Sequence, residues 1–585
     1  MPCSGQHAAG GAGAMERGLL GIAAVAAGTA LAAAGLQQAL RQARPELTSE
    51  SSDRLVHRTG RFDPDPGRRR QARLLQAAGL AEDPATRLQL LRGQGWGSGL
   101  LPPVVLKLQA LDQQRLGRPQ AARSLWQELW RRFPKAPPAA DALYALGRSG
   151  SPERRLLLQR FPAHPAALAA ALEWQQSLGG SLGGLHLARW GDRWPGGDKA
   201  MAAACRAGTG LTPAQRDLLA GGLAEQGDLI AARRCLGPLP PQTARTRERL
   251  AARAPEPGPA ERAWERTRQL LLQRDWRGAS TSLANDRSSD GSPPREARRR
   301  FWLGLTAALQ GRRQEAQQHW QTLLRSHPYG YYAWRASERL QAPPPAVPPA
   351  ATASGLLPPA VAELSRLNLA EEAWEHWRTW RGGTTPTTPA DLWREGQLRL
   401  AVGDRWIGLA QLDRAALAGA ARNPAEQALL EHQRHPLSYQ PQLQQAAAAT
   451  GVDRNLITAI ARQESRLTPT VHSVAGAVGL MQLLPETARM VAPPGPFRPL
   501  EDPAWNALLG ARYLRQLLQD TGGEPMLAVA SYNAGPGAAQ GWINPDLKGL
   551  PELWAEAIPY PETRHYVKTV LGNRWTYRLL NGSNR

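Results

Sequence analysis

One carboxylate near the C-terminal end of the chain has the setting that acid catalysis requires. Glu464 follows Ile457 and Ile460 at helical spacing, so it falls on the same stripe of a helix, and that stripe should be buried. Burial disfavours the ionised form and raises the pKa of a carboxyl group, as a general acid working near neutral pH requires. Spacing alone leaves an alternative open, in which Glu464 lies at the helix edge and pairs with Arg462 or Arg466 on the surface.

The loop after this carboxylate contains two glycines, which widen the range of backbone conformations it can adopt. Gly476 and Gly479 let the backbone take a positive φ or approach a ligand closely, and Pro485 is placed to open the next helix. Met481 and Gln482 then lie in a tight turn between the loop and that helix. The sequence therefore predicts that these two side chains line a cleft.

Two further segments carry polar side chains near helix ends. Residues 530–535 run from an apolar stretch into Tyr532 and Asn533 and stop at a glycine, which is typical of a helix end that faces a site. The last segment opens with a proline and places Glu562 and Tyr566 four residues apart, on one face of a helix. Taken singly, such fragments are more often caps or core polarity than chemistry.

Together and in this order, the segments resemble the catalytic domain of the soluble lytic murein transglycosylases, whose fold is similar to goose-type lysozyme. The resemblance covers roughly residues 436 to 582, and it is specific because four separated blocks keep their order and spacing. The four blocks are Glu464-Ser465, Ser473 to Gln482, Tyr532 to Gly535, and Glu562-Thr563-Arg564 with Tyr566.

The resemblance implies one catalytic residue, Glu464, acting first as acid and then as base. It implies protonation of the β-1,4 oxygen between N-acetylmuramic acid and N-acetylglucosamine, then closure of a 1,6-anhydro ring by the muramic 6-hydroxyl. Ordinary glycosidases need two carboxylates, and these motifs offer no evident partner for Glu464. The residues implied to bind the sugars are Ser465, Ser473, Gly479, Met481, Gln482, Tyr532, Asn533 and Tyr566.

Two other classes of function use the same residues. A hydrolytic lysozyme-type muramidase would keep Glu464 as the acid but deliver water, and it should show a second carboxylate or an organised water site. A non-catalytic peptidoglycan-binding scaffold is the other alternative, which the intact Glu464 disfavours. We expect no metal and no cofactor, since His472 and His565 have no partners at ligand spacing and no phosphate-binding loop is present.

The first 44 residues resemble a secretory signal or an uncleaved membrane anchor. The stretch 15–36 is apolar apart from its start, and Arg17 precedes its uncharged part. This predicts export, to the periplasm or to the outer face of the inner membrane, with membrane contact through this segment if it is not cleaved. An ordinary buried helix is the alternative, and both Met1 and Met15 are candidate starts.

The long middle of the chain predicts an α-solenoid. Its signal is a repeat in which Gly, Ala, Trp and Pro recur at offsets of 5, 9 and 17 residues, as in one half of a tetratricopeptide-like helix pair. We expect this superhelix to offer a surface to protein partners. The two copies are Gly117, Ala122, Trp126 and Pro134, and Gly311, Ala316, Trp320 and Pro328.

The fold class predicted is therefore all-α, with a tetratricopeptide-like solenoid followed by a lysozyme-like, mainly α catalytic domain. A Pro-rich stretch separates the two parts and should be an extended connector. The predicted divisions are a leader at 1–44, a basic tether at 45–70, the solenoid at 71–341, the connector at 342–359, a helical linker domain at 360–435 and the catalytic domain at 436–585.

The positive net charge of the chain predicts a polyanionic partner. It carries 71 basic against 49 acidic residues, a formal charge of +22. Nucleic acid is not expected as a partner, because there is no binding motif and the basic residues are dispersed. Cell-wall polymer bearing carboxylates fits the charge equally well, so peptidoglycan glycan strands are the predicted partner. Solvated helix faces in an arginine-rich chain are the alternative.

Three cysteines are too few for a disulfide scaffold. Cys3 lies before the apolar leader. Cys205 and Cys235 could pair in an oxidising compartment, although free buried thiols are the commoner arrangement. The sequence does not decide between these states.

Overall fold

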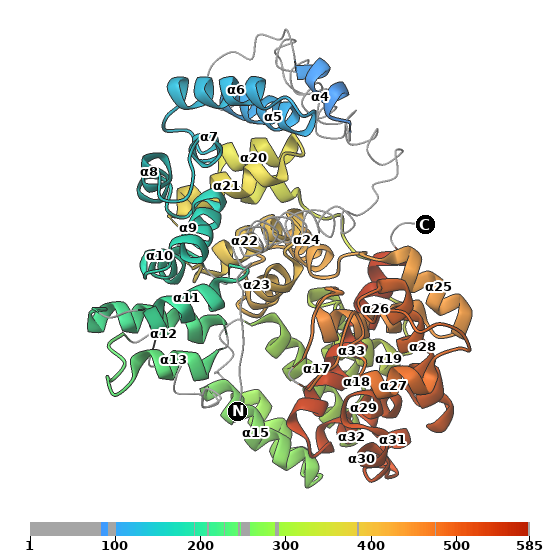
Figure 1. The fold of residues 1–585 in the computed structure, drawn as a ribbon. Coiled ribbons are helices and arrows are strands. Elements are labelled where there is room, and N and C mark those ends of the chain that lie inside the picture. Colours follow the sequence, from blue (N-terminus) through green and yellow to red (C-terminus); the bar gives the residue numbers. More distant parts are fainter. Residues whose placement is uncertain are drawn as a thin grey trace, which may run out of the picture.

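The computed structural model of the protein is built from α-helices, with no strand among the described residues (Figure 1). This confirms the predicted all-α class. The predicted leader, 1–44, and tether, 45–70, lie outside the described part of the chain. No helix in the described part is both long and apolar enough to cross a membrane. The structure describes residues 83–91, 101–191, 194–207, 210–226, 228–243, 246, 258–286, 292–382, 385–473 and 475–582.

The N-terminal half of the solenoid is a row of helices, each packed on its neighbours in sequence (Figure 1). The row comprises α4 (Pro84–Leu91), α5 (Leu101–Arg115), α6 (Pro119–Arg132), α7 (Pro138–Leu146), α8 (Pro152–Arg160), α9 (Pro165–Leu178), α10 (Leu182–Trp190), α11 (Gly197–Ala207), α12 (Pro213–Gln226) and α13 (Leu229–Leu236). One apolar core runs from α7 to α13. A disulfide joins Cys205 on α11 to Cys235 on α13, whose Cα atoms are 5.6 Å apart, so the pair that the sequence left undecided is bonded.

The sequence repeat is also a structural repeat. Gly117 and Gly311 both take a positive φ, +70° and +80°, in the turn that joins two helices of a pair. In both copies the tryptophan that follows, Trp126 or Trp320, is buried in the core between the helices. The indole N–H of Trp320 also donates to the carbonyl of Phe301 on the preceding helix (3.1 Å). These matching conformations confirm the predicted tetratricopeptide-like pairs.

The second part of the solenoid leads to the C-terminal helices and shares a core with them. It consists of α15 (Pro259–Leu272), α16 (Trp276–Asn285), α17 (Pro293–Leu309), α18 (Arg313–Ser326) and α19 (Tyr331–Leu340). Its core contains Phe301 and Trp302 together with Trp575 from the end of the chain. The indole N–H of Trp575 donates to the carbonyl of Pro328 at 2.9 Å, which fixes the two parts to each other.

A connector and five helices then bring the chain back to its N-terminal arm. Residues 342–352 contain no helix; after them come η1 (Ala353–Leu356), α20 (Pro359–Arg366), α21 (Ala370–Arg381), α22 (Pro389–Ala401), α23 (Arg405–Leu417) and α24 (Pro424–Arg434). Leu364 and Trp377 share a core with Leu91 and Val104 of α4 and α5. In Figure 1 the yellow helices α20 and α21 accordingly lie beside the blue ones.

The last nine helices of the described part include α26, which packs on α25, α28 and α33. They are α25 (Gln440–Thr450), α26 (Arg454–Ser465), α27 (Pro485–Val491), α28 (Pro503–Asp520), α29 (Pro525–Ala534), α30 (Pro536–Gln540), α31 (Asp546–Gly549), α32 (Pro551–Ala557) and α33 (Pro561–Gly582). Their core includes Tyr331 from α19. Helix α33 passes so close to α19 that a Cβ on Gly572 would lie 2.6 Å from the backbone nitrogen of Tyr331.

Candidate active site

Helix α26 presents the predicted acid at its last turn. The carboxylate of Asp453 accepts a hydrogen bond from the N–H of Asn455 (2.9 Å) and so caps the start of the helix. Ile457 and Ile460 are fully buried, as their spacing predicts. Glu464 continues their stripe at the edge of this core, where its side chain is half-buried.

The carboxylate of Glu464 meets a phenol from another helix. The hydroxyl of Tyr566, on α33, donates to Oε1 of Glu464 at 2.5 Å. Burial raises the pKa of Glu464 to about 7; the bond from Tyr566 works against this rise and the negative charge of Glu562 adds to it. Near neutral pH the group is therefore divided between its acid and its base form, as a residue that must both donate and accept a proton requires.

The alternative surface pairing of Glu464 is not what the structure contains. Arg462 pairs instead with Asp413 of α23, with Nη2 2.6 Å from the carboxylate. Arg466 lies over the ring of Trp406, its guanidinium carbon 4.4 Å from the ring centroid. Both arginines thus contact the linker helix α23, and the carboxylate of Glu464 accepts its hydrogen bond from Tyr566.

The loop after α26 depends on one close backbone approach. Val478 and Leu483 exchange backbone hydrogen bonds of 3.0 and 3.1 Å and close a tight turn. Within it Gly479 has φ +87°, and a Cβ there would lie 2.3 Å from the Asn506 amide nitrogen and from the Leu500 carbonyl oxygen. Only glycine fits this position.

Asn506, on α28, holds this loop from beneath, a role that the sequence analysis did not assign. Its side chain is fully buried, and its amide nitrogen donates to the carbonyls of Val478 and Leu500 at 2.9 Å each. Its amide oxygen accepts from the N–H of Met481 at 2.8 Å. An amide on the core-facing side of a helix, where an apolar residue is expected, is the signal that could have revealed it.

The structure corrects the expected roles of Met481 and Gln482. The side chain of Met481 is fully buried against α28, so it does not line a cleft; its carbonyl accepts the hydroxyl of Tyr532 at 2.8 Å. The amide nitrogen of Gln482 donates to the carbonyls of Val471 and Gly479, both at 2.9 Å. Both side chains therefore shape the loop, and only the amide oxygen of Gln482 remains available as a ligand group.

Ser465 and Ser473 also serve the local backbone. Ser465 is fully buried, and its hydroxyl donates to the carbonyl of Leu480 at 2.8 Å, which ties the loop to the end of α26; the expectation that it lines a sugar subsite is corrected accordingly. Ser473 is exposed at the start of the loop, where its hydroxyl accepts from the N–H of Ala477 (2.9 Å).

Tyr532 and Asn533 end α29 beside the acid. Burial, with the charge of Glu464 next, raises the pKa of the Tyr532 phenol well above its usual value, which places that phenol in the same electrostatic environment as the carboxylate. The amide oxygen of Asn533 accepts the hydroxyl of Thr563 at 2.7 Å and joins α29 to the first turn of α33. Of the predicted residues, Glu464, Tyr532 and Tyr566 therefore form the centre of the site.

Comparison with known proteins finds relatives of this part of the chain. A family model described as "Transglycosylase SLT domain" matches residues 441–551, which hold α26, the loop and α29. A relative named soluble lytic murein transglycosylase, from Escherichia coli (strain K12), is 31% identical over 336 residues, or 54% of this chain and 48% of that protein. Residues 441–551 of this chain are therefore similar to the transglycosylase SLT domain.

Two further similar proteins are found. A putative soluble lytic murein transglycosylase from Haemophilus influenzae is 34% identical over 153 residues, 25% of this chain and 26% of that protein. A solved structure of the lytic transglycosylase Slt from Pseudomonas aeruginosa is 20% identical, covers 91% of this chain and 86% of that chain, and has a TM-score of 0.44. The chain spans about half the length of the first curated relatives it matches.

Within the described residues, one cluster has the donor atoms of a metal site. The ligand atoms of Asp141, His164 and Glu375 lie within 4.8 Å of one another. However, the ammonium of Lys107 already lies among them, 2.5 Å from Glu375 and 3.2 Å from Asp141. In addition, Nδ1 of His164 accepts from the N–H of Ala166, so the neutral ring carries its proton on Nε2, the nitrogen that a metal would need. We assign the cluster to packing between α21 and the solenoid.

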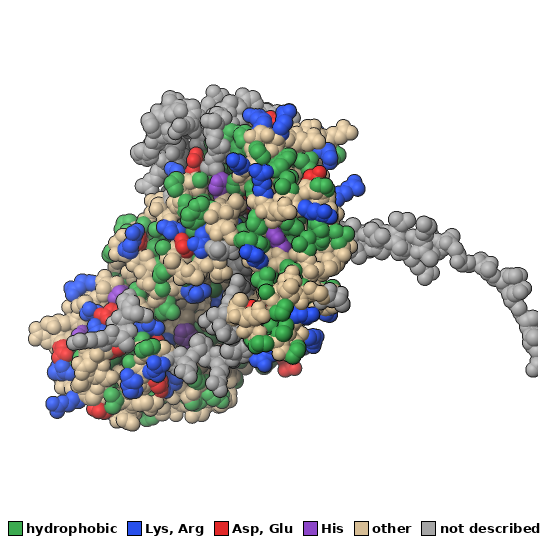
Figure 2. Space-filling model, turned by 90° about the vertical axis from the view of Figure 1, so that its left-hand side faces the viewer, with side chains coloured by type: hydrophobic (Ala, Val, Ile, Leu, Met, Phe, Trp, Pro, Cys, Tyr) green, Lys and Arg blue, Asp and Glu red, His purple; other side chains and the backbone are tan. Residues whose placement is uncertain are grey.

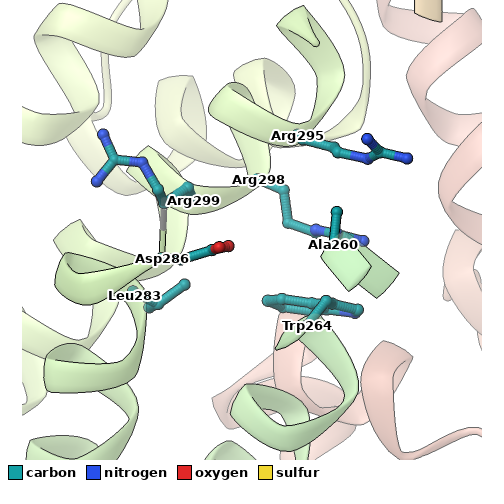
Figure 3. A pocket seen from close by; sticks show the side chains of 7 residues that line it. All are labelled: Ala260, Trp264, Leu283, Asp286, Arg295, Arg298 and Arg299. Carbon is teal, nitrogen blue, oxygen red and sulfur yellow. The ribbon is translucent and has the colours of Figure 1, made fainter. Parts of the chain in front are cut away.

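A pocket between α15, α16 and α17 gathers several arginines away from the family motifs (Figure 3). The guanidinium carbon of Arg298 lies 4.2 Å from the centre of the Trp264 ring, and the Asp286 carboxylate points into the same space. Arg295 and Arg298 both pair with Glu261, at 3.5 Å. Because carboxylates balance much of this positive charge and no motif residue lines the pocket, we assign it no part in the reaction.

Proposed function

We propose that this protein is a peptidoglycan lytic transglycosylase. It would cleave the β-1,4 bond between N-acetylmuramic acid and N-acetylglucosamine and form 1,6-anhydromuramic acid. The observation that carries the proposal is the pair of Glu464 and Tyr566, in a domain that matches the transglycosylase model. The curated relatives are named for the same activity.

The first step is proton donation by Glu464. Because the hydroxyl of Tyr566 donates to Oε1, the acidic proton would belong on Oε2 and would pass to the substrate from there. The pKa of Glu464, about 7, keeps a large share of this carboxyl group protonated at neutral pH. As the bond between the anomeric carbon and the bridging oxygen breaks, the proton passes to that oxygen, and N-acetylglucosamine leaves as an alcohol.

The second step uses the carboxylate that the first step leaves behind. The 2-acetamido group of the muramic residue stabilises its anomeric carbon until the 6-hydroxyl of the same sugar attacks. Glu464 accepts the hydroxyl proton as the new carbon–oxygen bond closes the anhydro ring. The bond from Tyr566 stabilises the ionised carboxylate at this stage. No water is consumed, because the nucleophile already belongs to the bound sugar.

Other groups on the loop and on α29 would orient the sugars. The Tyr532 phenol, the exposed Ser473 and the amide oxygen of Gln482 are the proposed contacts, with Asn533 holding the first turn of α33 in place. Gly479 supports the site by allowing the loop to pack closely on α28.

The position of Glu562 is the observation that favours the hydrolytic alternative. This exposed carboxylate, on the first turn of α33, lies close enough for its charge to raise the pKa of Glu464. A hydrolase needs a second carboxylate to activate water. We propose that Glu562 acts only through its charge, and the products of digestion distinguish the two reactions.

The proposed location is the periplasm, facing the cell wall. The disulfide between Cys205 and Cys235 supports an oxidising compartment, and so does the predicted leader. Figure 2 shows Lys and Arg side chains scattered among acidic ones over the face it displays, a distribution that suits weak attraction to a polyanionic wall better than a nucleic-acid groove. Protein partners on the solenoid, and membrane contact through the leader if it stays uncleaved, are part of the same proposal.

Digestion of purified peptidoglycan tests the proposal. The full chain and its Glu464→Gln variant would be incubated with sacculi, and the soluble products identified by mass spectrometry. We expect muropeptides that end in 1,6-anhydromuramic acid, and their loss in the variant. Reducing ends would identify a hydrolase, and no products from the wild-type chain would favour a binding scaffold.

A further inference from the structure

The carboxyl end of α24 contacts both helices that build the acid site. Glu464 lies on α26 and Tyr566 on α33, so the hydrogen bond between them depends on how these two helices are held. Helix α24 ends at Arg434 and is followed by His435. One of these residues contacts α26 and the other contacts α33.

The contact with α26 runs through Arg462, two residues before the acid. Nε of Arg462 donates to the carbonyl of Arg434 at 2.7 Å, and its Nη2 lies 2.6 Å from the carboxylate of Asp413 on α23. Nε of Arg434 donates to the same oxygen of Asp413 at 2.9 Å. One carboxylate oxygen therefore joins α23, α24 and α26.

The contact with α33 runs through His435. Its Nε2 lies 3.1 Å from the side-chain amide of Asn573, and its Nδ1 lies 2.9 Å from the carbonyl of Glu431. Asn573 follows Tyr566 by seven residues, or two helical turns, and so lies on the same face of α33. The imidazole also packs edge-on against the ring of Tyr577, with centroids 5.1 Å apart.

The charges in this contact compensate one another. Burial alone would raise the pKa of Asp413, but the charges of Arg462 and Arg434 outweigh it and hold the pKa well below its usual range. Glu431 behaves alike: burial opposes ionisation, yet Arg434 and His435 bring its pKa to about 2. Both carboxylates are ionised at neutral pH, so the contact persists through the working range of the acid.

We propose that Asp413, Arg434 and His435 are positioning residues that hold α26 and α33 at the separation at which Tyr566 donates to Glu464. We call these three residues the clamp. The inference rests on the proposed function, since it concerns the alignment of the same acid. It implies that the linker helices α23 and α24 take part in catalysis without touching substrate.

Replacement of one clamp residue tests this with a matched control. Asp413→Asn keeps the size of the side chain and removes the charge that holds two arginines. Asp391→Asn is the control, because Asp391 is also a half-buried linker carboxylate that pairs with two arginines, Arg381 at 2.7 Å and Arg394 at 3.1 Å, within α21 and α22. Asp413→Glu restores the charge and should restore part of the activity.

The expected result is a loss in turnover rather than in binding. For Asp413→Asn we expect kcat to fall about ten- to hundredfold with KM within about twofold, as for a displaced acid. The groups that face Glu464 are Tyr566 and Glu562 on α33 and Tyr532 on α29. Since a weakened bond from Tyr566 lets the pKa of Glu464 rise, the alkaline limb of the pH profile should also move to higher pH. The inference is overturned if this variant matches the Asp391→Asn control.

Hydrogen exchange gives a readout that needs no activity. In full-length Asp413→Asn, the amides of α26 and of the middle of α33 should exchange faster than in the wild-type chain, and Asp391→Asn should leave them unchanged. If the Asn variant does not fold, Asn573→Ser removes the other contact and should have the same effects. A wild-type chain without transglycosylase products would refute the proposed function, while exchange would still decide whether the clamp holds the helices. Unchanged amide exchange in both Asp413→Asn and Asn573→Ser would refute the clamp.

Discussion

Tyr566 and Glu464 lie 102 residues apart in the chain and share a hydrogen bond of 2.5 Å. The bond has two consequences that act in opposite directions. It orients the carboxyl group, which favours both proton transfers, and it stabilises the ionised form, which lowers the pKa that burial has raised. The reactivity of the acid is therefore set by the balance between its burial and this one phenol.

Tyr566→Phe tests this balance. Removal of the hydroxyl should let the pKa of Glu464 rise above about 7. The protonated acid then survives to higher pH, so the alkaline limb of the pH–rate profile should move upward. At neutral pH kcat should fall about tenfold, because the carboxylate formed in the first step loses one hydrogen bond to a charged group. A profile with an unmoved alkaline limb would show that the phenol does not control the acid.

Glu464→Gln should separate stability from activity. The folded-state pKa of Glu464 lies above its unfolded value of 4.5, so the wild-type chain loses stability as pH rises from 4.5 through about 7. The amide has no charge to bury and still accepts from Tyr566. At pH 8 the variant should be more stable by up to about 3 kcal/mol, the equivalent of this shift, and at pH 4 the two should be equal. Unfolding of both proteins in denaturant at the two pH values measures the difference.

Glu562→Gln should change the pH dependence but not the products. The charge of Glu562 raises the pKa of Glu464, so its removal should lower that pKa and move the alkaline limb of the profile to lower pH. The muropeptides released should still end in 1,6-anhydromuramic acid. If the wild-type chain also released reducing ends and this variant did not, Glu562 would be a second catalytic carboxylate and the assignment would change to a hydrolase.

Local sequence patterns predicted what depends on neighbours in the chain. The stripe of Ile457 and Ile460 predicted that Glu464 shares the buried face of a helix, because helical periodicity is a local property. Gly479 was predicted to take a positive φ or to approach a ligand closely, and its φ is positive. The repeated Gly and Trp spacing identified the solenoid pairs, since each pair is one local unit that packs on the next.

Roles that depend on distant contacts could not be read in this way. Whether Ser465 or Gln482 faces a sugar or a carbonyl of its own loop depends on where the loop is held, and Asn506 of α28 holds it. The clamp is a stronger case, since Asp413 reaches Arg462 across 49 residues and His435 reaches α33 across 138. Nothing in the spacing of either residue pointed to the acid.

Two glycines of the active-site loop offer a matched pair of substitutions. Gly476 and Gly479 have nearly the same backbone, φ +84° and +87°, so alanine is strained at both by about 1 to 2 kcal/mol. At Gly476 the new Cβ meets nothing within 4 Å, whereas at Gly479 it would lie 2.3 Å from the side chain of Asn506.

Gly479→Ala should therefore lose more than Gly476→Ala, and the excess measures how closely the loop must pack on α28. Because Asn506 also holds the carbonyl of Val478 and the N–H of Met481, a displaced loop should move the Met481 carbonyl away from the hydroxyl of Tyr532. We expect Gly479→Ala to lose at least about 2 kcal/mol more stability than its partner, from overpacking, and most of its activity. Denaturant unfolding and anhydromuropeptide release measure the two effects. Equal losses in the two variants would mean that backbone strain alone matters and that the contact with Asn506 does not.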